Sequence, residues 1–226
     1  MKSNIPQTIG VIMDGNRRFA KKNGKLPWSG HKEGFSKLEE LVEWVAEAKI
    51  KNVIVYAFST ENWNRSKKEV SEIMNLLIVG LTKKISELVE RGARVSFIGN
   101  RSHFSKTTQK LINDAEKNKP KKESVHLIIA LSYGGKDELV RTTQELVKNR
   151  IPITEESISK TLDTKNIPDP DLIIRTGGEM RLSNFLLWQS TYSELFFTNT
   201  LWPDFSKKEF LKILDEFKQR ERRNGK

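Results

Sequence analysis

Short apolar runs alternate along the chain with longer segments in which apolar residues recur every three or four positions. The runs have the length of β-strands and are apolar throughout, which is typical of parallel strands buried on both faces of a sheet. Most of them end at glycine, asparagine, serine or threonine, the residues that favour turns. We predict strands at residues 8–13, 53–58, 94–98, 125–131, 172–174 and 194–198.

Helical periodicity fills the segments between these strands. Ser66 and Glu69 have the spacing of a capping box and open a long apolar stripe, which Gly92 is placed to end. Ser206 and Glu209 repeat the capping box near the end of the chain. We predict helices at residues 35–46, 66–89, 105–118, 135–148, after Thr154 and from 206 to 217. The alternation indicates an α/β fold: one domain over residues 1–226 with a central, mostly parallel six-stranded sheet flanked by helices.

Composition narrows the classes of site. The 226 residues include no cysteine and only three, widely separated histidines, which argues against disulfides, thiolate metal sites and a zinc site. The chain has no apolar run of about 18 residues and no apolar stretch of signal-peptide length near Met1, so we expect a cytoplasmic protein. The net charge of +11 suits nucleic acid, acidic lipid headgroups or phosphorylated small molecules. Lysines that only solvate helix faces would explain the charge equally well.

The first predicted strand ends at a cluster of polar residues, Asp14-Gly15-Asn16-Arg17-Arg18. Amide groups at a helix start bind anions, and glycine lets a ligand approach the backbone. Arginine contacts phosphate oxygens in pairs, and aspartate is a good ligand for Mg²⁺, which commonly bridges a carboxylate and a diphosphate. The cluster therefore predicts a phosphate site, although a helix cap with solvated arginines fits the same residues.

Two more loops follow predicted strands and carry similar residues. Residues 175–184 supply two arginines, two glycines and hydroxyl groups, and residues 59–65 supply polar groups around Trp63 and Arg65. Neither segment has P-loop spacing. A structural turn would explain the first segment, and Trp63 plugging the core with Arg65 paired to a glutamate would explain the second. Since the carboxyl ends of parallel strands share one edge, we expect the loops to form one site. That site would take two phosphorylated ligands, or one ligand with a long phosphate chain.

Together these motifs resemble the cis-prenyltransferases, a family that includes undecaprenyl and dehydrodolichyl diphosphate synthases. The resemblance runs in collinear order from about Pro6 to Gly225. It implies a Mg²⁺-dependent enzyme that condenses isopentenyl diphosphate with an allylic diphosphate to give a Z-polyprenyl diphosphate for lipid-carrier biosynthesis. It also implies a homodimer and a hydrophobic tunnel for the growing chain. The matching segments are residues 12–20, Gly30-His31, residues 56–65, and residues 175–179 onward to Glu194.

The resemblance also implies roles for individual residues. Asp14 would be the essential acid and would bind Mg²⁺ together with Glu194, and Asn62 would accept or relay a proton. The segment Arg223-Asn224-Gly225 would reach across the dimer interface. The implied contacts of the allylic substrate are Gly15, Asn16, Arg17, Arg18, Phe19, His31, Trp63 and Arg65. Ser59, Thr60 and Glu61 would line the reaction region, and Arg175, Arg181, Leu182 and Ser183 would hold isopentenyl diphosphate.

The chain departs from the family pattern at a few positions. Pro27 stands where the family often has arginine, and whether Lys25 replaces it is open. Ala57 is small and the helix from residue 69 to 90 lacks an obvious insertion, features that favour a medium-length product by resemblance. The alternatives are an altered condensation mode, a short-chain product or a non-catalytic partner subunit. Intact catalytic motifs argue against a non-catalytic subunit. No motif supports nucleic-acid binding, whereas peripheral association with acidic membranes fits the charge.

Overall fold

One parallel sheet forms the centre of the molecule. The structure is a computed structural model and describes residues 5–220. Every neighbouring pair of strands in it is parallel, in the order β3-β4-β2-β1-β5-β6, so the sheet is parallel throughout and confirms the predicted six-stranded α/β domain. The strands are β1 (Thr8–Ile12), β2 (Asn52–Ser59), β3 (Ala93–Ile98), β4 (Val125–Tyr133), β5 (Leu172–Arg175) and β6 (Glu194–Phe197).

The helices follow the predicted pattern with two differences. The predicted helix from residue 66 to 89 contains a π-helical turn, η2 (Gly80–Lys84), between α3 (Lys67–Val79) and α4 (Ile85–Glu90). The first long helix, α2 (Pro27–Glu47), begins at Pro27 instead of residue 35. Its first two turns carry no apolar stripe, so periodicity alone does not predict them, whereas proline is favoured at a helix start. The other helices are α1 (Asn16–Lys22), α5 (Lys106–Lys117), α6 (Gly135–Lys148), α7 (Glu155–Ser159) and α8 (Lys207–Gln219).

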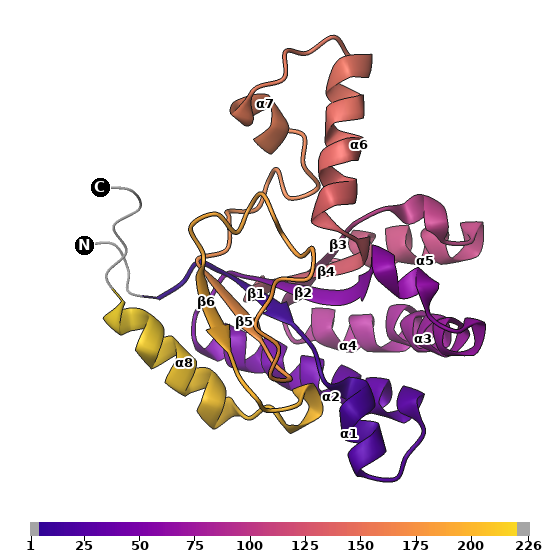
Figure 1. Cartoon of the computed structure of the whole chain (residues 1–226), viewed down its shortest axis with the longest axis vertical. Helices are drawn as coiled ribbons and strands as arrows, with labels where there is room; N and C mark the ends of the chain where they lie inside the picture. Colours follow the sequence, from indigo (N-terminus) through magenta and orange to yellow (C-terminus); the bar gives the residue numbers. More distant parts are fainter. Residues whose placement is uncertain (1–4, 221–226) are drawn as a thin grey trace.

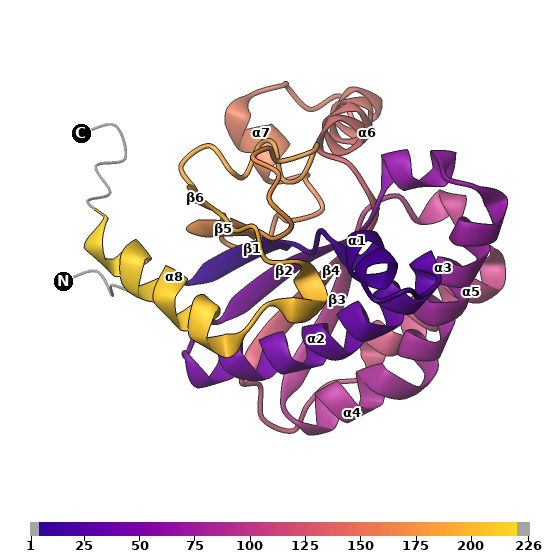
Figure 2. The same cartoon turned by 60° about the horizontal axis from the view of Figure 1, so that its bottom comes forward.

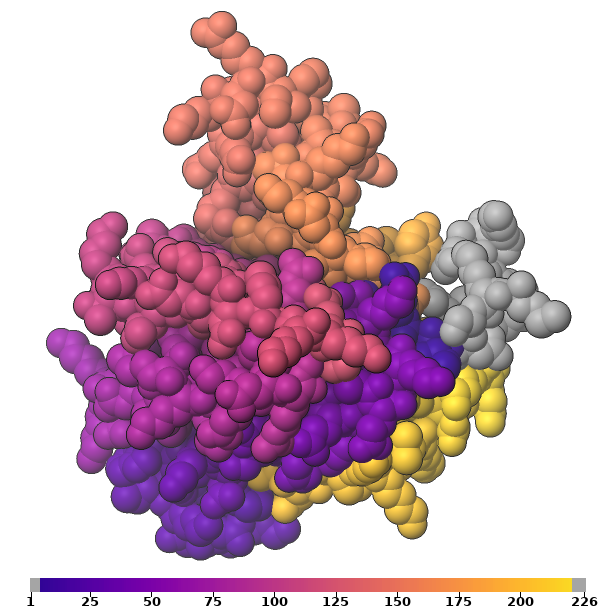
Figure 3. All heavy atoms as spheres, turned by 180° about the vertical axis from the view of Figure 1, so that it is seen from behind, coloured from indigo at the N-terminus to yellow at the C-terminus, as the bar shows by residue number. Residues whose placement is uncertain are grey.

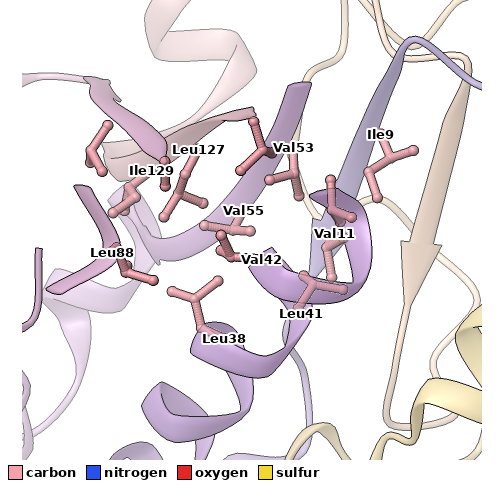
Figure 4. Packing of buried hydrophobic residues seen from close by; sticks show 14 of the residues in the cluster. Ile9, Val11, Leu38, Leu41, Val42, Val53, Val55, Leu88, Leu127 and Ile129 are labelled. Carbon is pink, nitrogen blue, oxygen red and sulfur yellow. The ribbon is translucent and has the colours of Figure 1, made fainter. Parts of the chain in front are cut away.

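Helices cover one face of the sheet. In Figure 2, α2, α4 and α8 lie along this face, and Figure 4 shows α2 directing its side chains toward β1 and β2. Leu38, Leu41 and Val42 pack there in one buried cluster with Val11 and Val55. The apolar stripe of α2 and the alternate residues of the strands thus bury each other, which is the main hydrophobic contribution to this layer.

The opposite face is covered near β1 by a loop. Phe185 and Leu186 are fully buried and pack against Ile12, Ile54 and other strand residues of this face. The approach is close at Gly10, where a Cβ atom would lie 3.1 Å from Cε1 of Phe185. Glycine in the middle of β1 therefore makes room for the loop that carries Arg181 and Ser183.

Helices α6 and α7 project from the sheet. In Figure 1 they stand above the rest of the chain, and Figure 3, which views the molecule from behind, shows the same projection at the top. Helix α6 leaves Val140 and Val147 more than half exposed. Among the described residues, no helix has both the length and the apolar character required to cross a membrane.

The strand order creates one position suited to ligands. Strand β1 lies between β2 and β5, and the chain runs to opposite sides of β1 to form these neighbours. In open parallel sheets, ligands bind outside the carboxyl ends of the strands at such a switch point. Asp14 follows the carboxyl end of β1, so the predicted phosphate loop lies at this point.

Candidate active site

The turn after β1 is fixed by backbone contacts from the far end of the chain. The Asp14 carbonyl accepts hydrogen bonds from the Trp202 amide at 3.0 Å and the Thr176 hydroxyl at 2.8 Å. Gly15 has a φ of 112°, and a Cβ atom there would lie 3.0 Å from the backbone of Leu201. Only glycine fits this turn, and the position of the Asp14 carboxylate is determined by it.

Two arginines hold the Asp14 carboxylate. Arg175 is 4% exposed and donates from Nη2 to Oδ2 of Asp14 at 2.9 Å, and Nη2 of Arg18 lies 3.2 Å from Oδ1. Arg18 packs over Gly177, where a Cβ atom would lie 2.6 Å from its Nη2. The acid and two of the predicted phosphate-binding arginines therefore form one cluster from the loops after β1 and β5.

The same arginine organises the loop after β5. Nη1 of Arg175 donates to the Ser183 hydroxyl at 2.7 Å and to the Arg181 carbonyl. Ser183 also accepts from Nε of Arg181 at 3.2 Å, and its carbonyl accepts from the Tyr56 hydroxyl at 3.3 Å. Burial raises the pKa of Tyr56 above its ordinary value, so this hydroxyl keeps its proton and acts as a donor. The predicted isopentenyl diphosphate residues Arg175, Arg181 and Ser183 are thus adjacent.

The third predicted loop forms the 3₁₀ turn η1 (Thr60–Asn64) at the end of β2. Oδ1 of Asn62 accepts a hydrogen bond from the Ser59 amide at 3.2 Å, which closes a capping box. Glu61 accepts from Nδ2 of Asn184 at 2.7 Å. Burial raises the pKa of Glu61, but hydrogen bonds from Asn184 and from its own backbone outweigh it, and the pKa lies below the ordinary value.

Trp63 is packed into the core beside this turn. Its Nε1 donates to the Ser132 hydroxyl at 2.9 Å, and its ring lies 5.0 Å from Phe58 and 5.6 Å from Phe104 between centroids. Trp63 therefore packs against the core, which was one of the alternatives that the sequence left open. Arg65 pairs with Glu69 at 3.0 Å, the other open alternative, and it also faces the site.

His31 and Asn16 meet on the inner side of the phosphate loop. Helix α2 approaches closely here because Gly34 has no side chain: a Cβ atom would lie 2.2 Å from Oδ1 of Asn16. Nε2 of His31 and Oδ1 of Asn16 are buried and have no hydrogen-bond partner among the described residues. Burial, followed by the charge of Arg65, lowers the pKa of His31 from 6.5 to about 4. A neutral imidazole and an amide therefore present free polar atoms to a ligand.

A basic pocket of about 720 Å³ lies outside the phosphate loop. Arg17, Arg18 and Arg65 line it together with His31, and two lysines that the motifs did not identify, Lys21 and Lys25, line it as well. Lys25 lies 3.4 Å from Glu33. The pocket has the charge and size for a diphosphate.

An apolar cavity of about 120 Å³ leads away from the same loop. Met13, Asn16 and His31 line one part of it, and the rest is apolar side chains of α2, α3, α4 and the sheet. Helix α3 has no fully buried residue, because its apolar stripe faces this cavity instead of a closed core. This cavity is the candidate for the hydrophobic tunnel that the resemblance implies.

Not every predicted residue joins this group. Glu194 lies beside Leu172 at the amino end of β5, whereas Asp14 follows the carboxyl end of β1, and Glu194 accepts from Arg220 at 2.6 Å. Phe19 and Leu182 do not line the pockets described above, and Leu182 packs against the loop-covered face of the sheet. Within residues 5–220, no group of three histidine, aspartate or glutamate side chains is placed to hold a metal. Arg223-Asn224-Gly225 lies outside the described residues.

Sequence reasoning did not single out Asn184, Tyr56 or Lys21, and it left the role of Lys25 open. Asn184 directly follows Ser183 in the same loop, which was the available signal for it. Tyr56 lies within an apolar strand, and nothing in that run distinguishes its hydroxyl from a core side chain. The remaining predicted residues, including Ser59 and Thr60, lie in or beside the common site.

Known proteins resemble the whole chain. Residues 12–225 match the family model described as "Putative undecaprenyl diphosphate synthase". The isoprenyl transferase of Aquifex pyrophilus is 46% identical over 100% of this chain and 98% of its own length. A tritrans,polycis-undecaprenyl-diphosphate synthase (geranylgeranyl-diphosphate specific) of Thermococcus kodakarensis is 45% identical over 98% of this chain and 88% of its own.

A solved structure agrees with these sequence matches. Lavandulyl diphosphate synthase from Lavandula x intermedia, in complex with dimethylallyl diphosphate, superposes with a TM-score of 0.92 at 33% identity and full coverage of both chains. The chain therefore has the fold of a known enzyme. The chain belongs to the undecaprenyl diphosphate synthase family of cis-prenyltransferases and is a prenyl-transferring enzyme.

Proposed function

We propose that this enzyme condenses isopentenyl diphosphate with an allylic prenyl diphosphate and elongates it to a Z-polyprenyl diphosphate used in lipid-carrier biosynthesis. One observation carries the proposal: the Asp14 carboxylate lies between Arg18 of one arginine-rich loop and Arg175 of the other. Two anionic substrates bound to these loops would meet at Asp14.

The allylic diphosphate is assigned to the basic pocket. Arg17, Arg18 and Arg65 line it, and it shares Met13, Asn16 and His31 with the lining of the apolar cavity. A prenyl diphosphate has a charged head and an apolar tail, which matches this succession. Isopentenyl diphosphate is assigned to Arg175, Arg181 and Ser183, which line the neighbouring pocket together with Asn62.

The residues present fit a bound Mg²⁺. This ion is commonly held by one or two carboxylates and completed by substrate phosphates and water, and Asp14 supplies a carboxylate at the boundary of the two anion sites. When bound, Mg²⁺ supplies positive charge that stabilises the leaving diphosphate. A role of Glu194 in binding the ion remains a prediction, because one chain places it at the opposite end of the sheet.

The chain's own residues support an ionisation mechanism. As the allylic C–O bond breaks, negative charge grows on the diphosphate, and arginines already aimed at it stabilise the transition state. Neutral His31 and Asn16 offer polar atoms where the head meets the tail. The isopentenyl double bond then attacks the allylic carbon, and one proton leaves the new chain, with Asn62 proposed as its acceptor or relay. Orientation matters most in this step, because the alkene has no group to activate.

Product size and assembly follow from other parts of the fold. The apolar cavity would receive the growing chain, and small Ala57 at its wall suits a medium-length product. The exposed apolar residues of the projecting α6 suit a second copy of the chain, so we propose a homodimer.

The enzyme is proposed to be cytoplasmic, with its excess positive charge attracting it to acidic membranes. Failure to sediment with anionic vesicles at low salt would exclude this last point.

An altered condensation or a short-chain product is the second candidate. The TM-score of 0.92 to a lavandulyl diphosphate synthase favours keeping it, as does proline at position 27. Incubation with labelled isopentenyl diphosphate, Mg²⁺ and allylic primers of different lengths, followed by chromatography, separates the candidates. Successive additions to the primer support elongation. A product made from two allylic molecules supports the second candidate, and no Mg²⁺-dependent incorporation excludes elongation.

A further inference from the structure

Asn184 connects three parts of the active site. Its Nδ2 donates to Oε1 of Glu61 at 2.7 Å, and its Oδ1 accepts from the Lys136 amide at 2.9 Å. Its carbonyl accepts from the Gly135 amide at 2.7 Å. One residue thus joins the loop after β5 to the turn after β2 and to the first turn of α6.

The backbone at this point has an uncommon conformation. Ser183 and Asn184 have φ values of 50° and 68°, the left-handed region that residues with a side chain seldom adopt. This conformation turns the Ser183 hydroxyl toward Arg175 and its carbonyl toward Tyr56. Strained turns persist where surrounding contacts fix them, and the contacts of Asn184 are suited to that task.

The side-chain amide of Asn184 also packs closely against Gly134. A Cβ atom at Gly134 would lie 2.6 Å from Nδ2 of Asn184 and 2.5 Å from Oγ1 of Thr60. The amide is therefore packed between Gly134 and Glu61 and has little freedom to turn. An amide is also the group that these neighbours require, because it donates to a carboxylate with one atom and accepts from a backbone N–H with the other.

A displacement of Glu61 would also displace Asn62. The two residues are consecutive in η1, and the Asn62 side chain closes the capping box on Ser59. A link that fixes Glu61 therefore also fixes the turn that carries the proposed proton relay. On the other side, Asn184 directly follows Ser183, which is assigned to isopentenyl diphosphate.

We propose that Asn184 is a positioning residue that couples the loop carrying Arg181 and Ser183 to Glu61, and so holds the isopentenyl diphosphate site in register with Asn62. The inference rests on the function proposed above for these loops. It assigns Asn184 a specific effect: its loss weakens the use of isopentenyl diphosphate and leaves binding of the allylic substrate nearly unchanged.

Asn184→Asp tests the link with a minimal change. The variant keeps the shape of the side chain and the acceptor for the Lys136 amide, but it places a second carboxylate against Glu61. Because like charges at this separation repel, we expect the KM for isopentenyl diphosphate to rise roughly tenfold, against less than about twofold for the allylic substrate. The increase should shrink at lower pH, where the two carboxylates can share a proton.

A double-mutant cycle separates coupling from damage to either residue. Asn184→Asp combined with Glu61→Gln exchanges the amide and the carboxylate and restores one hydrogen bond between them. We expect Asn184→Asp to cost roughly tenfold in the wild-type background and less than about twofold in the Glu61→Gln background. An equal cost in both backgrounds overturns the inference.

Asn184→Gly guards against a trivial loss of folding. Glycine adopts a φ of 68° without strain, so the turn is retained while the side-chain links are lost. We expect an unchanged or higher melting temperature together with a raised KM for isopentenyl diphosphate. Wild-type KM values for both substrates in this variant overturn the inference. Wild-type protein that never incorporates isopentenyl diphosphate refutes the proposed function, and this inference with it.

Discussion

Nη2 of Arg175 lies 2.9 Å from Oδ2 of Asp14, and this contact joins the loop after β5 to the loop after β1. The arginine is 4% exposed, whereas the side chain of the acid is 30% exposed and faces two pockets. The buried guanidinium group lies beneath the partly open carboxylate and fixes its direction. This relationship makes Asp14 the centre of the proposed chemistry.

Replacement of Asp14 by asparagine is expected to abolish condensation. The amide has the same shape but carries no charge to hold Mg²⁺ or pair with Arg175, so we expect kcat to fall by about 10³-fold or more. Labelled isopentenyl diphosphate incorporation measures the loss, and circular dichroism checks the fold. Asp137→Asn is a matched control, because Asp137 has the same 30% exposure and pairs with Arg141 at 2.8 Å on α6. Near-wild-type turnover by Asp14→Asn would refute the mechanism.

His31 is expected to make stability sensitive to acid. Burial and the charge of Arg65 lower its pKa from 6.5 in the unfolded chain to about 4 in the folded protein. The unfolded chain binds the proton of His31 more readily than the folded protein does. The stability that neutral His31 contributes is therefore complete above pH 6.5 and is lost as the pH falls toward 4. A shift of this size corresponds to about 3 kcal/mol.

His31→Gln should therefore flatten the dependence of the unfolding free energy on pH between 6.5 and 4, as measured by urea denaturation. His126 offers a control, since burial and the charge of Arg94 lower its pKa to about 4 as well. It contacts Ser96 away from the pockets, so His126→Gln should flatten the same curve without raising the KM of the allylic substrate. An unaltered pH profile in His31→Gln would contradict the assigned neutral imidazole.

Lys21 and Lys25 are expected to support allylic diphosphate binding in place of an arginine at position 27. Both line the basic pocket, whereas Lys22, which follows Lys21 on α1, does not. Exposed charge contacts contribute up to about 1 kcal/mol each, so the double alanine variant should raise the allylic KM roughly three- to tenfold. The effect should diminish at high salt, because screening weakens exposed charges. Lys22→Ala should behave as wild type, and equal effects of all three lysines would indicate only general attraction.

The sequence patterns predicted those parts of the fold that depend on local periodicity. Apolar runs such as residues 125–131 identify buried parallel strands. The rule that strand ends share an edge predicts that Asp14, Asn62 and Arg175 lie close together, and they line one pocket. The start of α2 was missed because Gly30 and Gly34 are there to let the helix approach Asn16, a tertiary requirement with no periodic signal.

Distances across the sheet were beyond sequence patterns. Glu194 was grouped with Asp14 by resemblance, although the predicted strand 194–198 begins at this residue. The register of β6 against β5 shows that it lies at the amino end. The π-helical turn at residues 80–84 interrupts a helix whose apolar residues recur regularly. Apart from Gly80 itself, no glycine or proline in this segment predicts the interruption. Asn184 shows the same limit, because its partners Glu61 and Lys136 are far from it in the sequence.

Phe35 is expected to limit the length of the product. Its ring lies in the wall of the apolar cavity and packs on Gly80, where a Cβ atom would be 2.9 Å from Cε2 of the ring. Phe35→Ala removes this part of the wall and should give longer products, whereas Gly80→Ala should push the ring into the cavity and give shorter ones. Chromatography of products made from one primer measures both shifts.

Val42→Ala is the control for this pair of variants. Val42 lies on the same helix and is 4% exposed, but it packs against the sheet and does not line the cavity. Its truncation should destabilise the protein by about 2 kcal/mol and leave the product distribution unchanged. If Val42→Ala shifted the products as Phe35→Ala does, chain length would follow general stability instead of the cavity wall. Opposite shifts in Phe35→Ala and Gly80→Ala would assign the limit to the contact between these two residues, because each variant alters that contact from a different side.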